Sequence, residues 1–281
     1  MTDRNLDPSD TAGLYMYRLD VSGYTDDLPY WNSLVVSQKP RRLLELGSGL
    51  GRLLWPMMRE AMKQRDDFRA VGLDISAPTL AIAKKDLANN PDLAARLELV
   101  EADMTDFDLR QPDSDERELF DLVVIAFNGF AYLADPEKQL SCLKAVRRHL
   151  APGGLVGIDM IVPQLSYLAL SQKGAPLRMG RDISNPAPGI SRLIRMDSER
   201  YDSARQIEYD TWFYELYTDD GQVERATFDV AWQMVFPNEL ELMMRLAGLR
   251  VVSRYGDYER NPFDRHSDLY LWVAQRDDDP E

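Results

Sequence analysis

The chain has 281 residues, 44% of them apolar and 28% charged, which is typical of a globular protein with a full hydrophobic core. Its net charge of −14 disfavours nucleic acid as a partner, because phosphates need a basic surface. The single cysteine, Cys142, excludes an internal disulfide and suits a reducing compartment. The chain has no signal-peptide pattern, and its longest apolar run is too short to cross a bilayer, so we expect a cytoplasmic protein without membrane contact.

Apolar strands alternate with amphipathic helices from about Arg41 to Ile161. Strands separated by helices imply right-handed crossovers and a doubly wound, mostly parallel α/β sheet. A helix from Asn238 and two further strands complete a predicted seven-stranded sheet. The predicted strands cover residues 43–46, 70–74, 96–104, 120–127, 155–162, 250–257 and 268–275.

The alternation is interrupted after Pro163 by an insertion. A polar stretch rich in glycine and proline, residues 172–189, is typical of a loop. Three long segments with alternating apolar residues follow and predict an antiparallel β meander. We therefore expect an N-terminal cap over residues 1–36, a ligand-binding α/β core over 37–162 and 237–276, and the insertion over 163–236.

The segment Leu43 to Arg52, LLELGSGLGR, carries the strongest ligand signal. A strand containing Glu45 runs into glycines at every second position, Gly47, Gly49 and Gly51, where backbone can approach a ligand closely. The spacing is G-x-G-x-G rather than the G-x-G-x-x-G of dinucleotide folds, and Glu45 would repel a pyrophosphate. An acid here suits the ammonium of S-adenosylmethionine, which carries no phosphate.

Other predicted strands end in residues suited to a nucleoside. Asp74 follows the second strand and can accept both ribose hydroxyls. Asp103 and Met104 follow the third and suit the adenine, although Glu101 and Asp106 compete with Asp103 for that role. Ligands of doubly wound sheets bind at these carboxyl ends. The pattern therefore predicts one nucleoside site at this edge.

Five stretches together resemble the class I S-adenosylmethionine-dependent methyltransferases in order and spacing. They are ELGSGLG, VGLDIS, EADM, FDLVVIAFNGFAYL and HLAPGGLVGID. The resemblance covers residues 40–160 and, as a last helix and two strands, 237–275. The antiparallel insertion is similar to that of bacterial small-molecule N-methyltransferases of the amino-sugar and glycine–sarcosine type. This likeness implies a Rossmann-like methyltransferase fold, and an insertion that covers the acceptor or builds a homo-oligomer.

The resemblance also implies residue roles. The methionine part of S-adenosylmethionine is expected to contact Glu45, Gly47, Ser48, Gly49 and Gly51. Asp74 is expected to hold the ribose, with Ile75, Asp103 and Met104 around the adenine. Phe127 and Asn128 match the position that faces the transferred methyl, and Tyr24 and Tyr30 match N-terminal aromatics placed over the cofactor.

The sequence favours methyl transfer to a small-molecule amine. In-line displacement on an amine needs orientation and exclusion of water more than a strong base. Asn128, Tyr132 and Asp159 are the candidate catalytic residues, although Asn128 has an equal reading as a turn residue. His149 and His266 are poorly placed for a base, and no metal-ligand cluster stands out.

Three alternative functions stay open at this stage. An enzyme that alkylates with the aminobutyryl chain of the same cofactor would keep every cofactor motif. A protein methyltransferase remains compatible with the acidic charge, although nothing resembles a peptide groove. A catalytically silent cofactor-binding scaffold is the third, because no general base is evident.

Overall fold

The computed structural model describes residues 11–111, 114–172, 174 and 177–278. The chain divides into two compact units. We call Asp26–Val162 with Val235–Glu281 the α/β unit, and Met1–Thr25 with Pro163–Met234 the antiparallel unit. Residues 1–10 of the expected cap and the tail residues 279–281 lie outside the described part.

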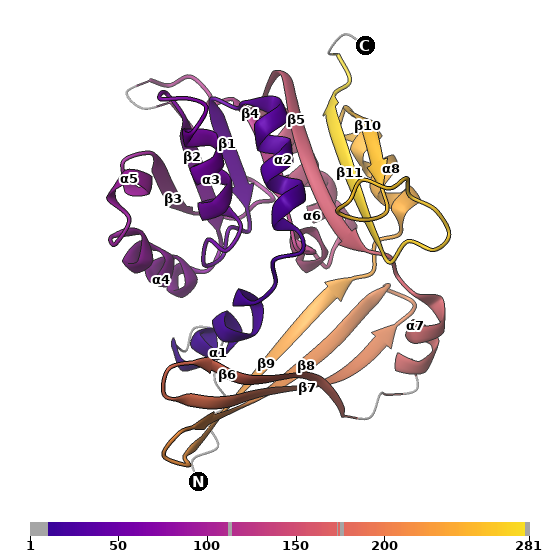
Figure 1. Cartoon of the computed structure of the whole chain (residues 1–281). Coiled ribbons are helices and arrows are strands. Elements are labelled where there is room, and N and C mark those ends of the chain that lie inside the picture. Colours follow the sequence, from indigo (N-terminus) through magenta and orange to yellow (C-terminus); the bar gives the residue numbers. More distant parts are fainter. Residues whose placement is uncertain (1–10, 112–113, 173, 175–176, 279–281) are drawn as a thin grey trace. The chain divides into compact units, whose positions relative to one another are not determined.

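In the described part of the α/β unit, a seven-stranded sheet has the order β10-β11-β5-β4-β1-β2-β3 (Figure 1). Strands β1 to β5 run parallel, and β11 is antiparallel to both β5 and β10. This topology confirms the predicted doubly wound sheet, whose order reverses between β1 and β4. The strands are β1 (Arg42–Leu46), β2 (Arg69–Asp74), β3 (Leu97–Glu101), β4 (Phe120–Ile125), β5 (Leu150–Ile161), β10 (Leu249–Tyr255) and β11 (Leu269–Arg276).

Two helices of this unit begin at side chains that cap their first turn. The Ser76 hydroxyl accepts a 3.3 Å hydrogen bond from the Thr79 N–H, and Asp135 Oδ1 accepts from the Glu137 N–H at 2.8 Å. Both caps precede a proline that fits the first helical turn. The helices are α2 (Leu28–Gln38), α3 (Leu54–Met62), α4 (Ala77–Leu87), α5 (Pro91–Ala94), the 3₁₀ helix η1 (Gly129–Tyr132), α6 (Pro136–His149) and α8 (Pro237–Leu246).

Helix α2 contributes to the hydrophobic core of the α/β unit. Its Trp31 is fully buried, and a Cβ added at Gly157 of β5 would lie 2.6 Å from the indole ring. Glycine at this point of the strand therefore makes room for the tryptophan. The boundary between the units lies after Thr25, inside the segment that the sequence predicted as one N-terminal cap. Residues 26–36 belong to the α/β unit, and several of their side chains pack in its core.

The antiparallel unit contains a four-stranded sheet, in the order β6-β7-β8-β9 within the described residues (Figure 1). Its core forms where Met16 and Leu19 of the N-terminal helix pack on Tyr214, Ala226 and Phe228. Ala226 and Phe228 of one alternating segment are buried here, whereas Val230 and Trp232 farther along the same face are half-buried. The elements are α1 (Thr11–Ser22), α7 (Leu165–Ser171), β6 (Arg178–Ala187), β7 (Ile190–Asp202), β8 (Ile207–Thr218) and β9 (Val223–Gln233).

The loop predicted over residues 172–189 is wrong from Arg178 onward, where β6 forms. This strand pairs with β7 on one side only, and its register shifts between Met179 and Arg181 and between Ser184 and Ala187. An edge strand with such irregularities tolerates glycine and proline, which the sequence reading took as signs of a loop.

Candidate functional site

The candidate site lies at the carboxyl edge of the parallel strands. Glu45 is one residue before the end of β1, and Asp74 ends β2. The chain leaves β1 for β2 on one side and enters β4 on the other, so this edge contains the switch point where doubly wound folds bind ligands.

The turn after β1 has the backbone that the glycine spacing predicted. Gly47, Gly49 and Gly51 have φ angles of +70°, +53° and +81°. A Cβ at Gly47 would meet nothing within 4 Å, whereas one at Gly51 would lie 2.2 Å from the Trp55 ring. The first glycine thus faces open space at the edge, and the third allows α3 to pack closely.

Asp74 links the end of β2 to this turn. Its Oδ2 accepts a 2.8 Å hydrogen bond from the Gly49 N–H, and its Oδ1 accepts from the Ser76 N–H at 2.9 Å. Burial raises the pKa of Asp74, and these backbone donors oppose that rise. Each carboxylate oxygen has a second lone pair, so Asp74 can still accept two hydroxyl donors.

Glu45 is buried beneath the turn, close to an ion pair that the sequence reading did not identify. Arg52 donates two hydrogen bonds to the fully buried Asp27, at 2.8 and 2.6 Å. Burial raises the pKa of Glu45 well above its ordinary value, and Arg52 lowers it. Arg52 directly follows Gly51, so its place beside the turn could have suggested a role, whereas Asp27 gave no signal.

The turn after β4 has an unusual backbone. Phe127 and Asn128 both have positive φ, +55° and +58°, a region that costs non-glycine residues about 1–2 kcal/mol each. Asn128 Oδ1 accepts a 2.6 Å hydrogen bond from the Ile161 N–H at the end of β5. The Arg52 guanidinium lies 4.7 Å from the centre of the Phe127 ring. Two other segments of this edge, the end of β5 and the turn after β1, therefore hold this turn in one conformation.

Asp159 of β5 is 2% exposed and accepts a hydrogen bond from the Tyr258 hydroxyl. Burial raises the pKa of Asp159 to about 6, against the opposing effects of Tyr258 and of the backbone at Phe127 and Asn128. The structure thus brings Asp159 next to the turn after β4. Tyr132, in η1, is 45% exposed. The catalytic roles of these side chains stay predictions.

The residues expected around an adenine lie at the ends of the neighbouring strands β2 and β3. The Ile75 side chain is 69% exposed, directly after Asp74. Asp103 is exposed and accepts a 2.8 Å hydrogen bond from the Thr105 N–H, and Met104 is half-buried. The expected contacts of Ile75, Asp103 and Met104 with an adenine stay predictions.

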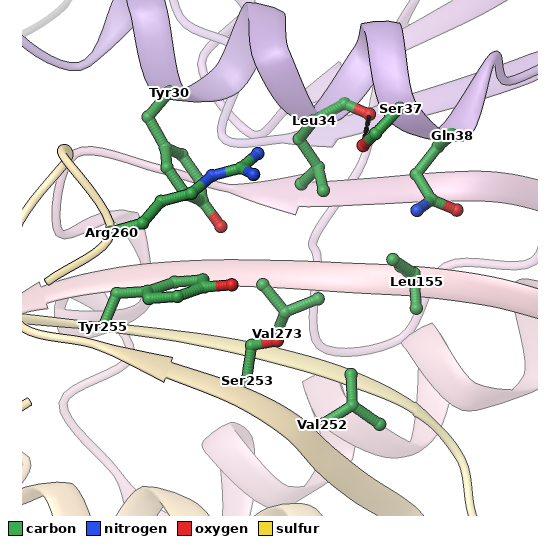
Figure 2. Close-up of a pocket in the computed structure, with 10 residues that line it drawn as sticks. All are labelled: Tyr30, Leu34, Ser37, Gln38, Leu155, Val252, Ser253, Tyr255, Arg260 and Val273. Carbon is green, nitrogen blue, oxygen red and sulfur yellow. Dashed lines mark hydrogen bonds between the residues drawn. The ribbon is translucent and has the colours of Figure 1, made fainter. Parts of the chain in front are cut away.

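Tyr24 and Tyr30 belong to different units. Tyr30 of α2 is 2% exposed and lines a cavity of about 160 Å³ between α2 and β5, β10 and β11 (Figure 2). Its ring centre lies 6.0 Å from that of Tyr255 and 5.5 Å from the Arg260 guanidinium. The structure therefore places Tyr30 in an aromatic cluster, and its expected contact with the cofactor, like that of Tyr24, stays a prediction.

Orphaned polar atoms at this edge fit a ligand with hydrogen-bond donors. Glu45 Oε2, Ser48 Oγ and Asp159 Oδ1 are buried without a hydrogen-bond partner in the described chain. Buried polar atoms are usually paired, so these positions favour a bound group that supplies donors. The ammonium and ribose hydroxyls of an adenosyl amino acid are such donors, and the open space before Gly47 admits them.

Two further properties concern the described residues as a whole. No group of three or more His, Cys, Asp or Glu side chains there is arranged to hold a metal ion. Nor does any described helix have the length and apolar character needed to cross a membrane.

Known proteins share both the sequence pattern and the fold. Residues 43–154 match a family model described as a methyltransferase domain. A relative named Cypemycin N-terminal methyltransferase, from a Streptomyces species, is 25% identical over 246 residues, covering 86% of this chain and 87% of the relative.

Solved structures cover nearly the whole chain. An S-adenosylmethionine-dependent methyltransferase from Clostridium acetobutylicum is 15% identical with a TM-score of 0.71, covering 94% of this chain and 98% of that one. The sugar N-methyltransferase KedS8 from a Streptoalloteichus species is 19% identical with a TM-score of 0.68, covering 97% of this chain and 96% of that one. At these identities the likeness shows a shared fold.

Proposed function

This chain is an S-adenosylmethionine-dependent methyltransferase, and we propose that it methylates an amine nitrogen of a small molecule. The observation that carries the proposal is a row of acids at the edge with the glycine turn, in which Glu45 and Asp159 are buried and Asp74 is half-buried. Acids whose oxygens lack hydrogen-bond partners can accept from the positively charged methionine part of the cofactor. They can also accept from an amine substrate that is protonated when it binds or becomes an ammonium on methylation.

We assign the cofactor contacts from the geometry of the edge. Gly47, Ser48 and Gly49 line the methionine part, with Glu45 accepting from its ammonium and Gly51 giving the turn its shape. Asp74 accepts from the ribose hydroxyls, and Ile75, Asp103 and Met104 surround the adenine. The support for this assignment is the positive φ of the glycines, the free lone pairs of Asp74 and the exposure of Ile75.

The cofactor supplies a methyl group on a positively charged sulfur. Once bound, the cofactor would give this methyl to the acceptor nitrogen with the bonding pair left on sulfur, and the nitrogen would then release a proton. The turn at Phe127 and Asn128 positions the nitrogen, because its backbone is fixed by Asp159, Ile161 and Arg52. Asp159, with a pKa of about 6, can take up the released proton near neutral pH.

An amine acceptor is favoured over an alcohol because no strong base is supplied in the described α/β unit. His149 is fully buried in α6, where its ring nitrogens face the Ala145 carbonyl and the Leu109 N–H. Burial also lowers its pKa. Two similar proteins, one named as an N-terminal methyltransferase and one as a sugar N-methyltransferase, support nitrogen as the methylated atom.

The test is turnover with a panel of small amines. The protein is incubated with methyl-labelled S-adenosylmethionine and each amine, and products are identified by mass spectrometry. We expect S-adenosylhomocysteine together with a methylated amine. Methylthioadenosine in place of S-adenosylhomocysteine would replace this proposal with alkylation by the aminobutyryl chain. A panel without turnover, while a matched set of alcohols reacts, would also overturn it.

A peptide N-terminus is a second candidate acceptor, favoured by the relative whose name specifies an N-terminal substrate. Short peptides with free and acetylated N-termini distinguish the two readings. Labelled methyl on the free peptide alone, with none on small amines, would assign the enzyme to peptides.

We further propose a homo-oligomer formed through the antiparallel unit. Leu165 and Leu170 of α7 are 70% and 68% exposed, and Met179 of β6 is 60% exposed. Large exposed apolar side chains are typical of interaction surfaces. Light scattering of the native protein and of a Leu165→Ser, Leu170→Ser variant tests this, because only an interface predicts dissociation of the variant.

A further inference from the structure

One face of the antiparallel sheet brings acidic side chains from neighbouring strands together. Asp210 of β8 pairs directly with Glu199 of β7, and Glu208 lies two residues before Asp210. Residues two apart on a strand point to the same face, and paired residues on adjacent strands are close neighbours. The register therefore places Glu199, Glu208 and Asp210 together, and we call these three residues the acidic cluster.

Helix α7 lies against one end of this cluster. Arg178 of β6 pairs with Glu199 and also donates a hydrogen bond to the Tyr167 hydroxyl of α7. The side chain of Ser171, at the end of α7, lies against Glu208 and lowers its pKa. Glu199 and Glu208 are consequently buried at 8% and 6% exposure, whereas Asp210 is only half-buried.

Arginine side chains on this face form ion pairs with acids other than Glu208 and Asp210. Among the described residues, no ion pair within 4.0 Å reaches Glu208 or Asp210, and Arg178 is engaged with Glu199. Arg195 contacts Asp20 and Asp197, at 2.6 and 2.8 Å, and Arg181 contacts Asp20 at 3.4 Å. Among these arginine contacts, that of Arg178 with Glu199 is the one that reaches the acidic cluster.

Two carboxylate oxygens of the acidic cluster also lack hydrogen-bond partners. Glu208 Oε1 and Asp210 Oδ1 are buried and unpartnered in the described structure. Glu208 is more than nine-tenths buried, and its carboxylate faces Glu199 and Asp210 closely enough to raise the pKa of Asp210. Burying an acceptor oxygen without a hydrogen-bond partner costs folding free energy unless a ligand supplies a donor.

Aromatic rings adjoin the acidic cluster. The Trp212 side chain hydrogen bonds to Asp210, and the Trp232 ring lies 6.0 Å from that of Trp212. Trp232 is paired with Glu208 across β8 and β9, and both tryptophans are half-buried. The Arg195 guanidinium lies 5.1 Å from the Trp212 ring, so this surface already accommodates a cation on an indole.

We propose that the acidic cluster and Trp232 form a binding site for an organic ammonium group. The ammonium would donate hydrogen bonds to Glu208 Oε1 and Asp210 Oδ1, and its alkyl part would lie against the indole. Carboxylates with unused acceptor atoms beside an aromatic surface are the groups that bind alkylammonium ions. The site lies within the antiparallel unit, and the binding of an ammonium compound to it can be measured without methyl transfer.

Proton release accompanies binding at this site. Burial and then the neighbouring acids raise the pKa of Glu208 to about 7 and that of Asp210 to about 8. The charged groups and phenols facing them from the adjoining elements are Asp20 of α1, Tyr167 of α7, Arg178 of β6, and Arg195, Asp197 and Glu199 of β7. Without a ligand the pair retains a proton near neutral pH, whereas an ammonium favours both carboxylates charged.

The experiment is calorimetric titration of the full chain with n-butylammonium near neutral pH, in phosphate and in HEPES. We expect saturable binding whose heat differs between the two buffers because protons are released. Glu208→Gln and Asp210→Asn should each weaken binding about tenfold or more, since a hydrogen bond to a charged group is worth at least a factor of ten. Asp229→Asn, the same change on the opposite face of β9, should leave affinity unchanged.

Neutral n-butanol provides the ligand control. Equal affinity for butanol and butylammonium, no saturable binding, or unchanged affinity in both Glu208→Gln and Asp210→Asn would overturn the proposal. Circular dichroism melts identify any variant that fails to fold. Both substitutions keep side-chain size and remove mutual repulsion, so we expect both variants to fold.

The ammonium could come from the acceptor itself or from a separate amine. If the proposed amine methylation holds, Asp210→Asn raises KM for a cationic acceptor without changing kcat when the acceptor occupies this site. If Asp210→Asn loses butylammonium binding but keeps the native KM for the acceptor, the site binds a separate ligand. Because butylammonium binding needs no turnover, failure of the methylation proposal and failure of this one give different results.

Discussion

The Gly49 N–H donates a 2.8 Å hydrogen bond to Oδ2 of Asp74, so the end of β2 fixes the glycine turn that follows β1. The same carboxylate holds the Ser76 N–H and, in our proposal, the ribose. In that proposal one side chain shapes both halves of the cofactor site, because it fixes the turn for the methionine part and accepts from the sugar.

Asp74→Ala should weaken S-adenosylhomocysteine binding by about 2–4 kcal/mol, because hydrogen bonds to a charged acceptor are worth about 1.5–3 kcal/mol each. Calorimetric titration measures the loss. Asp121→Ala is a matched control, since Asp121 Oδ2 also accepts from two backbone N–H groups, those of Arg41 and Arg42, at the opposite edge of the sheet. Unchanged affinity in Asp74→Ala would remove Asp74 from the site.

Asn128→Ala should lower the free energy of unfolding by about 1–3 kcal/mol, because alanine is strained at positive φ and cannot accept from Ile161. Asn128→Asp keeps the acceptor and tolerates this backbone, so its stability should stay near that of the native protein. Urea unfolding ranks the variants. Equal stability of the alanine and native proteins would show that this turn does not depend on Asn128.

Asp159 should make the protein less stable as pH rises from about 4 to 6. Its folded pKa of about 6 exceeds the usual 3.8, so the folded state binds the proton more tightly than the unfolded state. Between pH 4 and pH 7, Asp159→Asn should therefore gain about 2.4 kcal/mol of stability relative to the native protein, because most of the pKa difference, at 1.36 kcal/mol per pKa unit, takes effect in this range. Unfolding curves across this range measure the difference.

Tyr258→Phe tests the same carboxyl from the other direction. The Tyr258 hydroxyl lowers the pKa of Asp159, so its removal should raise that pKa and extend the pH-dependent loss of stability to higher pH. A difference between native and Asp159→Asn stability that stays constant with pH would contradict both expectations.

Local patterns in the sequence were enough to predict the α/β core and most of its ligand edge. Glycine spacing dictated the turn after β1, and acids placed just after apolar strands came together because parallel strands end at one edge. The caps at Ser76 and Asp135 likewise depend on local sequence alone, since each acts within three residues of itself.

Only the tertiary structure decided which residues support that edge. Asp27 reaches Arg52, and Tyr258 reaches Asp159 across 99 residues of sequence; neither partnership leaves a local pattern. The strand β6 was missed because an edge strand tolerates the glycine and proline that elsewhere mark a loop. The acidic cluster depends on the register of β7 with β8, and register is set by long-range pairing and burial rather than by neighbours in the chain.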